Sequence, residues 1–262
     1  MARLLVIGGG RMGEALVGGL VASGWAPAEA LAVVEVDAGR RDELVASHPG
    51  LVVGSEPVTA DGALIAVKPG DAAEAARAVG EVAGGRVLSV AAGVTTATLE
   101  AALPPGTPVV RAMPNTPALV GMGASAIAAG THAGPDDLDW AAAILGAVGK
   151  VVRVPEVQLD AVTGLSGSGP AYVFLLAEAL VEAGVLNGLP RPTSHALAVQ
   201  TLRGAAALLA ETGDDPGVLR AQVTSPGGTT AAGLRALESA GVRAAVLDAV
   251  SAATERSRQL GR

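Results

Sequence analysis

The sequence predicts an α/β fold in which a doubly wound, mostly parallel sheet is followed by an all-helical domain. Residues 1–154 alternate short apolar runs with helical patterns, whereas the strand signal disappears after about Pro155. A glycine-rich turn follows the first apolar run. With 262 residues, 50% of them hydrophobic, the chain can hold one large domain or two modest ones. We therefore expect domains at 1–154 and 155–262.

The first domain is expected to alternate strands and helices along the chain. Apolar runs predict strands at Arg3–Ile7, Leu31–Val36, Leu51–Val53, Ala63–Val67, Arg86–Val90, Pro108–Ala112, Ala124–Ala128 and Lys150–Val154. Helical periodicity predicts helices at Met12–Ser23, Arg40–Ala46, Asp71–Val79, Thr96–Ala102 and Pro135–Val148. In such a sheet, ligands bind beyond the carboxyl ends of the strands.

The second domain shows only helical patterns, and its prolines and glycines mark where the helices begin and end. The expected helices are Val157–Leu165, Pro170–Leu186, Pro192–Glu211, Pro216–Thr224, Thr229–Ala240 and Val242–Leu260. The two longest are largely apolar and rich in small residues, as in Gly204–Ala207. In a lone domain they would leave much apolar surface exposed, so we expect a homodimer formed through them. Packing within one chain is the alternative.

The glycine-rich turn predicts a dinucleotide site. Gly8, Gly10 and Gly13 have the G-x-G-x-x-G spacing directly after an apolar strand and at the start of a helix. A second apolar strand follows, with Glu35 near its carboxyl end. This context is that of a Rossmann-like domain. The alternative is a glycine turn that holds no ligand.

The segment Ser225–Thr230, with the sequence Ser-Pro-Gly-Gly-Thr-Thr, predicts a site for a small carboxylate. It opens a helix, where unpaired backbone N–H groups and the helix dipole favour an anion. The hydroxyls of Thr229 and Thr230 can donate to the same ligand. The alternative is a helix–helix turn in which the threonines act only as caps.

Composition narrows the possible functions. Aromatic residues make up 2% of the chain and the net charge is −7, so we expect no nucleic-acid partner. The chain has no cysteine, which excludes disulfides, thiolate nucleophiles and cysteine-based metal sites; we expect no metal. The N-terminus does not look like a signal peptide, and charges interrupt the apolar stretches. We expect a cytoplasmic protein that does not span a membrane.

Acid–base groups are sparse. We expect the three histidines, His48, His132 and His195, to be solvated or structural. Lysine occurs only at Lys68 and Lys150, so the helical domain has none. Hydride addition to a protonated imine fits such a chain, because the reaction mainly needs proximity, a carboxylate clamp and a hydrogen bond to nitrogen.

These segments together resemble the pyrroline-5-carboxylate reductase family over nearly the full length. The matching segments are Ile7–Gly13, Val67–Pro69, Ser89–Val94, Arg111–Pro117, Gly164–Phe174 and Val223–Thr230. The resemblance implies reduction of (S)-1-pyrroline-5-carboxylate to L-proline, the last step of proline biosynthesis, with NADPH or NADH. It also implies homodimers that often assemble into decamers.

The resemblance further implies the residues of the site. For the substrate these are Gln222, Ser225, Gly228, Thr229 and Thr230, with Thr230 also reaching the ring nitrogen as the catalytic contact. For the coenzyme they are Gly8, Gly9, Gly10, Arg11, Met12, Gly13, Glu35, Ser55, Val67, Lys68, Pro69, Ala91, Ala92, Gly93, Asn115 and Glu156. Ser55 stands where relatives contact the adenosine ribose, although the loop is shortened, and Glu156 is implied to border the nicotinamide.

Glu35 departs from many relatives, which carry Ser, Thr or Asn at this position. A carboxylate here favours the ribose 2′-OH of NADH and repels a 2′-phosphate. Arg40 and Arg41 follow closely and could restore NADPH binding if they turn inward; otherwise they face solvent.

Two other functions remain open at this point. A silent dinucleotide-binding sensor would not need the Ser225–Thr230 clamp, and a hydroxy-acid dehydrogenase of the same plan would need a lysine in the helical domain.

Overall fold

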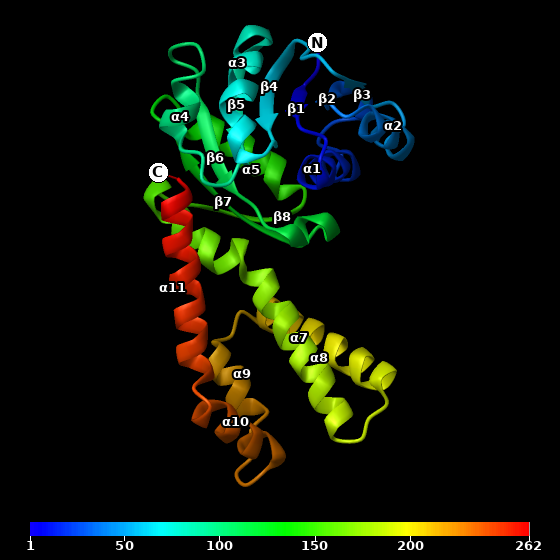
Figure 1. The fold of residues 1–262 in the computed structure, drawn as a ribbon, viewed down its shortest axis with the longest axis vertical. Helices are drawn as coiled ribbons and strands as arrows, with labels where there is room; N and C mark the ends of the chain where they lie inside the picture. Colours follow the sequence, from blue (N-terminus) through cyan, green and yellow to red (C-terminus); the bar gives the residue numbers. More distant parts are fainter. Residues whose placement is uncertain (262) are drawn as a thin grey trace. The chain divides into compact units, whose positions relative to one another are not determined.

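The computed structural model describes residues 1–261, except for the side chains at positions 83 and 84. Its contacts divide the chain into two compact units. Unit 1 comprises Met1–Ser168 together with the stretch from Ser251 to the C-terminus, and unit 2 comprises Gly169–Val250. Figure 1 shows the sheet in unit 1 and helices alone in unit 2.

Unit 1 is built on an 8-stranded sheet in the order β3-β2-β1-β4-β5-β6-β7-β8. The strands are β1 (Leu4–Ile7), β2 (Leu31–Val34), β3 (Val52–Gly54), β4 (Ala60–Ile65), β5 (Ala83–Ser89), β6 (Val109–Met113), β7 (Gly123–Ala129) and β8 (Gly149–Arg153). Neighbouring strands are parallel except for the antiparallel pair β6–β7. The predicted mostly parallel sheet is therefore confirmed, and the chain reverses its direction of growth between β1 and β4, as in a doubly wound fold.

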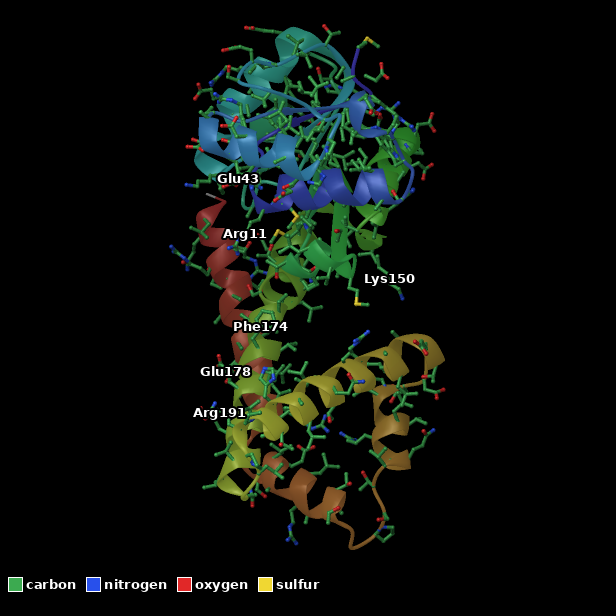
Figure 2. All side chains as sticks on the ribbon, turned by 90° about the vertical axis from the view of Figure 1, so that its right-hand side faces the viewer. Arg11, Glu43, Lys150, Phe174, Glu178 and Arg191 are labelled. Carbon is green, nitrogen blue, oxygen red and sulfur yellow. The ribbon has the colours of Figure 1, made fainter. Side chains whose placement is uncertain are left out.

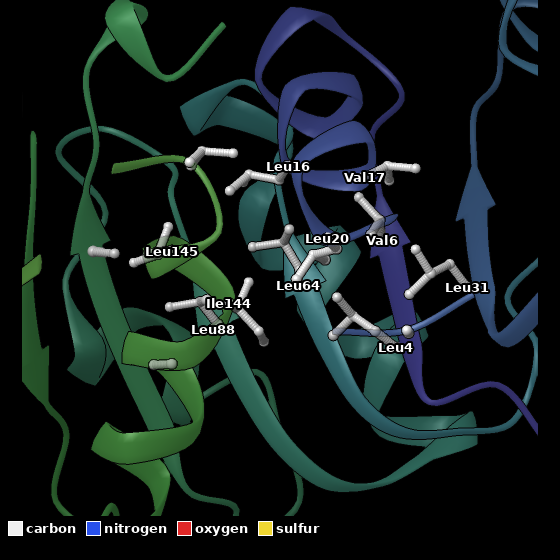
Figure 3. Close-up of a cluster of buried hydrophobic side chains, with 14 of the residues drawn as sticks. Leu4, Val6, Leu16, Val17, Leu20, Leu31, Leu64, Leu88, Ile144 and Leu145 are labelled. Carbon is white, nitrogen blue, oxygen red and sulfur yellow. The ribbon is translucent and has the colours of Figure 1, made fainter. Parts of the chain in front are cut away.

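Helices cover both faces of this sheet. They are α1 (Arg11–Ala22), α2 (Ala38–Ser47), α3 (Ala72–Val82), α4 (Thr96–Glu100) and α5 (Pro135–Gly146). Alternate residues of a strand point to opposite faces, so Leu4 and Val6 of β1 pack with α1 and α5, whereas Leu5 and Ile7 pack with α3 and α4. Figure 3 shows the first of these two cores, which is aliphatic throughout its labelled residues.

The second strand is shorter than predicted. β2 ends at Val34 instead of Val36, because Val36 is 86% exposed and the carbonyl oxygens of Glu35 and Val36 accept hydrogen bonds from Arg41 Nη1. Its end therefore lies level with that of β1, and the Glu35 side chain falls just beyond the sheet.

The link between the units is helical but irregular. It comprises a 3₁₀ turn (η4, Glu156–Gln158), a short α-helix (α6, Leu159–Val162) and a π turn (Thr163–Gly167). The last turn of α11 (Val242–Leu260) packs back onto it, where Ser257 Oγ donates to Asp160 Oδ1 at 2.6 Å. Packing thus divides the chain at 168/169, later than the domain boundary expected at 154/155, which remains a prediction.

Unit 2 contains α7 (Gly169–Leu186), α8 (Arg191–Thr212), α9 (Pro216–Gln222), α10 (Thr229–Ser239) and the first half of α11. Small residues bring α7 and α8 together, since a Cβ on Gly184 would lie 2.1 Å from Ser194 Oγ. Most apolar side chains of α7 are exposed, and Phe174, labelled in Figure 2, is 62% exposed. Within residues 1–261, the helical run Glu156–Leu186 is the one stretch whose length and hydropathy would suffice to span a bilayer.

Candidate active site

The register of the parallel strands brings the predicted coenzyme residues to one edge of the sheet. Ile7 pairs with Val34 and Ile65, Val34 pairs with Gly54, and Ile65 pairs with Ser89. The residues that follow these strands are therefore neighbours, and they include Gly8, Glu35, Ser55, Val67 and Ala91. This edge contains the point at which strand order reverses, where doubly wound sheets bind dinucleotides.

The glycine turn has the geometry that a dinucleotide requires. Gly8 has φ +102° and a Cβ there would lie 2.7 Å from the Ala66 carbonyl oxygen, while a Cβ on Gly13 would lie 2.1 Å from the Gly8 carbonyl oxygen. Apart from its neighbours in the chain, a Cβ on Gly10 would meet no atom of the described residues within 4 Å. Gly10 is the N-cap of α1 and has no side chain to cap the first helical N–H groups. The turn thus fits a pyrophosphate, held by those N–H groups.

Glu35 is bound to the glycine turn. Its Oε2 accepts the Gly9 N–H at 2.9 Å and its Oε1 accepts the Asp37 N–H at 3.0 Å. Arg40 lies on the other side of Gly9 and donates from Nε to the Gly9 carbonyl oxygen at 2.8 Å. Arg41 remains beside the backbone of Glu35, as described above. Neither arginine simply faces solvent, and the side chain of Arg40 is 24% exposed.

The other predicted coenzyme residues lie on loops at the same edge. Val67, Lys68 and Pro69 follow β4, and the segment Ala91–Gly93 follows β5. Asn115 follows β6, and both ends of its amide bind protein: Oδ1 accepts from Ala124 N at 2.8 Å, and Nδ2 donates to Ser166 O at 3.0 Å. The Asn115 side chain therefore ties the edge of the sheet to the π turn of the link.

Glu156 stands at the centre of a polar cluster. Its carboxylate accepts Thr96 N–H at 2.8 Å, Thr96 Oγ1–H at 2.6 Å and Arg111 Nη1–H at 3.0 Å. Burial by itself would raise the pKa of Glu156, but the hydrogen bonds from Thr96 and the pairing with Arg111 outweigh it and lower the pKa below its ordinary value. Glu156 therefore joins α4, β6 and the start of the link as a charged group.

The lowered pKa of Glu156 predicts a pH-dependent part of the stability. A carboxylate with a depressed folded pKa stabilises the fold above its unfolded pKa, about 4.3 for Glu, and loses this contribution as the pH falls through the folded pKa. We expect Glu156→Gln to lower the free energy of unfolding by about 1–2 kcal/mol at pH 7, because polar groups on Thr96 or Arg111 lose partners. Urea unfolding at pH 7 and pH 3.5 measures this, with the exposed Glu74→Gln as control. A deficit in Glu156→Gln that does not shrink at low pH would contradict the prediction.

The predicted substrate segment joins α9 to α10 in unit 2. Gly228 N–H donates to Ser225 O at 3.0 Å, and Gly227 has φ +70°, so the segment forms a tight turn. A Cβ on Gly228 would lie 2.4 Å from Ser225 Oγ, which places that hydroxyl against the N-terminus of α10. In the part of the chain that the structure describes, the hydroxyls of Ser225, Thr229 and Thr230 have no hydrogen-bond partner. The threonines therefore do not cap the helix, because Gly228 is its N-cap.

The structure thus forms two groups of candidate residues in different compact units. The coenzyme residues gather at the sheet edge of unit 1, and Gln222, at the end of α9, belongs with the turn in unit 2. No pattern in the sequence predicts a role for Thr96 or for Arg111. The sequence offers one signal, which is an arginine, Arg111, in an otherwise apolar strand. In the structure Arg111 is 8% exposed, and a buried cation requires an acidic partner.

Models of two protein families match the chain. The model for pyrroline-5-carboxylate reductase dimerisation matches residues 156–260, and the model for NADP oxidoreductase, coenzyme F420-dependent, matches residues 3–93. The second covers the strands and glycine turn of the coenzyme edge, and the first covers the apolar helices of unit 2.

The fold and the two family models define an NAD(P)-dependent oxidoreductase with a Rossmann-like domain and a helical dimerisation domain. The pyrroline-5-carboxylate reductase of Mycobacterium tuberculosis is 46% identical over 99% of this chain and 97% of its own, and that of Synechocystis is 45% identical over 99% and 98%. The chain belongs to the pyrroline-5-carboxylate reductase family, whose reaction serves proline biosynthesis.

Solved structures agree with this assignment over the whole chain. A pyrroline-5-carboxylate reductase from Coxiella burnetii is 36% identical with a TM-score of 0.93, covering 100% of this chain and 99% of that one. The Plasmodium falciparum enzyme, solved with NADP bound, is 30% identical with a TM-score of 0.86, covering 100% and 98%. The sensor and the hydroxy-acid dehydrogenase are therefore no longer the better descriptions of this chain.

Proposed function

We propose that the chain reduces 1-pyrroline-5-carboxylate at the Ser225–Thr230 turn, with the reduced nicotinamide held at the carboxyl edge of the sheet. The observation that carries this proposal is the set of hydroxyls at the N-terminus of α10 that have no hydrogen-bond partner within residues 1–261. The N–H groups of Thr229 and Thr230 and the helix dipole suit the substrate carboxylate, and the hydroxyls of Ser225 and Thr229 can add donors. Gln222 and Gly228 complete the proposed substrate residues.

Thr230 is proposed to contact the ring nitrogen of the substrate. The reduced nicotinamide, when bound, supplies the hydride, which goes to the imine carbon while the C=N π electrons pass to nitrogen. A nitrogen that already carries a proton becomes the neutral amine of proline. Thr230 Oγ1 holds this N–H in place, so the residue orients the imine and needs no proton of its own.

The proposed function is tested with purified protein. NADH and NADPH should each be oxidised when pyrroline-5-carboxylate is the only acceptor, at rates far above those without it. Coenzyme binding without turnover would contradict the proposal and return the sensor as the better reading.

We further propose that NADH is preferred over NADPH. Glu35 lies where the adenosine ribose is expected, and its carboxylate repels a 2′-phosphate. We expect Glu35→Ser to raise the NADPH/NADH ratio of kcat/KM by about tenfold, the effect of about 1.4 kcal/mol. Steady-state kinetics with both coenzymes measure the ratio, and Glu29→Ser, an exposed change away from this edge, is the control. An unchanged ratio in Glu35→Ser would show that Glu35 does not determine the preference between NADH and NADPH.

The match to a dimerisation domain indicates self-association through unit 2. Buried side chains in unit 2 are few, namely Val181, Ser194 and Ala198, while Phe174 and Leu175 of α7 are 62% and 67% exposed. Such a unit needs a second copy to cover its apolar helices. We propose a dimer as the basic assembly and a decamer as its higher form, and light scattering of the purified protein distinguishes them.

A further inference from the structure

Arg40 is held in place by three groups, and Glu14 is the one that comes from the coenzyme-binding helix. Arg40 Nη2 donates to Glu14 Oε2 on α1, Nη1 donates to Glu43 Oε2 at 2.7 Å, and Nε donates to the Gly9 carbonyl oxygen at 2.8 Å. Each guanidinium nitrogen therefore has a protein acceptor. Arg40 is thereby fixed to the glycine turn, with its charge compensated by two carboxylates.

Glu35 binds Gly9 as well, through the N–H group of that glycine. Gly9 N–H is bound by Glu35 while Gly9 C=O is bound by Arg40, so the two side chains hold one glycine between them. A Cβ on Gly9 would lie 2.5 Å from Leu44 Cδ1 and 3.3 Å from Glu35 Oε2, so the approach is close. The cation of Arg40 is thus close to Glu35, but its donors are already bound to protein acceptors.

We propose that Glu14 is a second determinant of coenzyme selectivity, because it holds Arg40 on the glycine turn and so withholds that cation from a 2′-phosphate. The proposal rests on the proposed coenzyme site at this edge. A 2′-phosphate needs donors with uncompensated charge, and arginine meets this need well when its fork is free. Removal of Glu35 alone ends the repulsion between its carboxylate and a 2′-phosphate, but it leaves Arg40 bound to Glu14. A change at Glu14 takes away the charged acceptor of Arg40 Nη2, while Nη1 and Nε keep Glu43 and the Gly9 carbonyl oxygen.

The test isolates the adenosine end of the coenzyme by comparing 5′-AMP with adenosine 2′,5′-bisphosphate. Isothermal titration of both probes into wild type, Glu35→Ser, Glu14→Gln and the double variant gives the effect of each change. We expect Glu14→Gln to tighten bisphosphate binding about tenfold further in the Glu35→Ser background, the value of one charge-assisted hydrogen bond. Adding Glu14→Gln to the wild type or to Glu35→Ser should change the binding of 5′-AMP by less than about twofold.

Two controls separate release of Arg40 from a simple change of charge. Asp42→Asn removes one negative charge from α2 without touching the contacts of Arg40, and it should give less than about a threefold gain. Arg40→Gln added to the double variant should abolish the gain. Glu14→Ala serves as a second variant if Glu14→Gln folds poorly.

Provided that 5′-AMP still binds, three results would each overturn the proposal. The double variant would bind the bisphosphate no more tightly than Glu35→Ser, the tighter binding would survive Arg40→Gln, or Asp42→Asn would tighten binding equally. Failure of the wild type to bind 5′-AMP would instead overturn the coenzyme site itself, and this inference with it.

Discussion

Thr230→Ala should lower kcat for pyrroline-5-carboxylate reduction by about 100-fold or more, the effect of losing one well-placed hydrogen-bonding group at a reacting centre. The Thr230 hydroxyl has no hydrogen-bond partner among residues 1–261, so the change breaks no hydrogen bond among them. The dissociation constant for NADH should stay within about twofold, because the coenzyme residues lie in the other compact unit. Steady-state kinetics and coenzyme titration by fluorescence measure the two effects.

Thr224→Ala is the matched control for this change. Thr224 lies in the same segment, but its hydroxyl already donates to the Arg220 carbonyl oxygen at 2.6 Å. Its loss should change kcat by less than about threefold, since no substrate contact is removed. Turnover that survives in Thr230→Ala, or an equal loss in Thr224→Ala, would show that the substrate is not held by the Thr230 hydroxyl.

Gly10→Ala should weaken NADH binding by at least about tenfold while the free protein stays folded. A Cβ at Gly10 meets no described atom within 4 Å beyond its neighbours in the chain, and the backbone there, with φ −65° and ψ −177°, suits alanine. The added methyl group therefore enters open space at the turn, which is where the pyrophosphate is proposed to bind. Fluorescence titration with NADH gives the affinity, and thermal unfolding without coenzyme gives the stability.

Gly13→Ala provides the contrast. Its Cβ would lie 2.1 Å from the Gly8 carbonyl oxygen, so the helix must move away from the strand, and both stability and affinity should fall. If Gly10→Ala binds NADH normally, or if it unfolds as readily as Gly13→Ala, the pyrophosphate does not pack against Gly10.

Much of the fold could be predicted because its signals are local. Each expected strand and helix of unit 1 has a counterpart, since apolar runs and helical periodicity report directly on burial in a sheet covered on both faces. The residues at which strands and helices end depend in addition on contacts between distant side chains and the backbone. The end of β2 depends on Arg41 binding two carbonyl oxygens, and this contact joins residues that no periodicity links.

The candidate site likewise has one part that could be predicted from the sequence and one part that could not. The glycine spacing and the Ser225–Thr230 segment could be recognised because turn geometry restricts the residue types within a few positions. The cluster of Glu156 with Thr96 and Arg111 could not, since its members are separated by 60 and 45 positions in the chain. The tie between Glu14 and Arg40 likewise depends on how α2 packs beside α1.

Transfer of hydride to the imine carbon is the central claim, and isotope tracing tests it most directly. The protein is incubated with pyrroline-5-carboxylate and NADH that carries deuterium at C4 of the nicotinamide, on one face and then on the other, and the product is analysed by mass spectrometry and NMR. We expect L-proline with one deuterium on the ring carbon that was double-bonded to nitrogen, from one of the two labelled coenzymes. Coenzyme oxidation without labelled proline from either would contradict it.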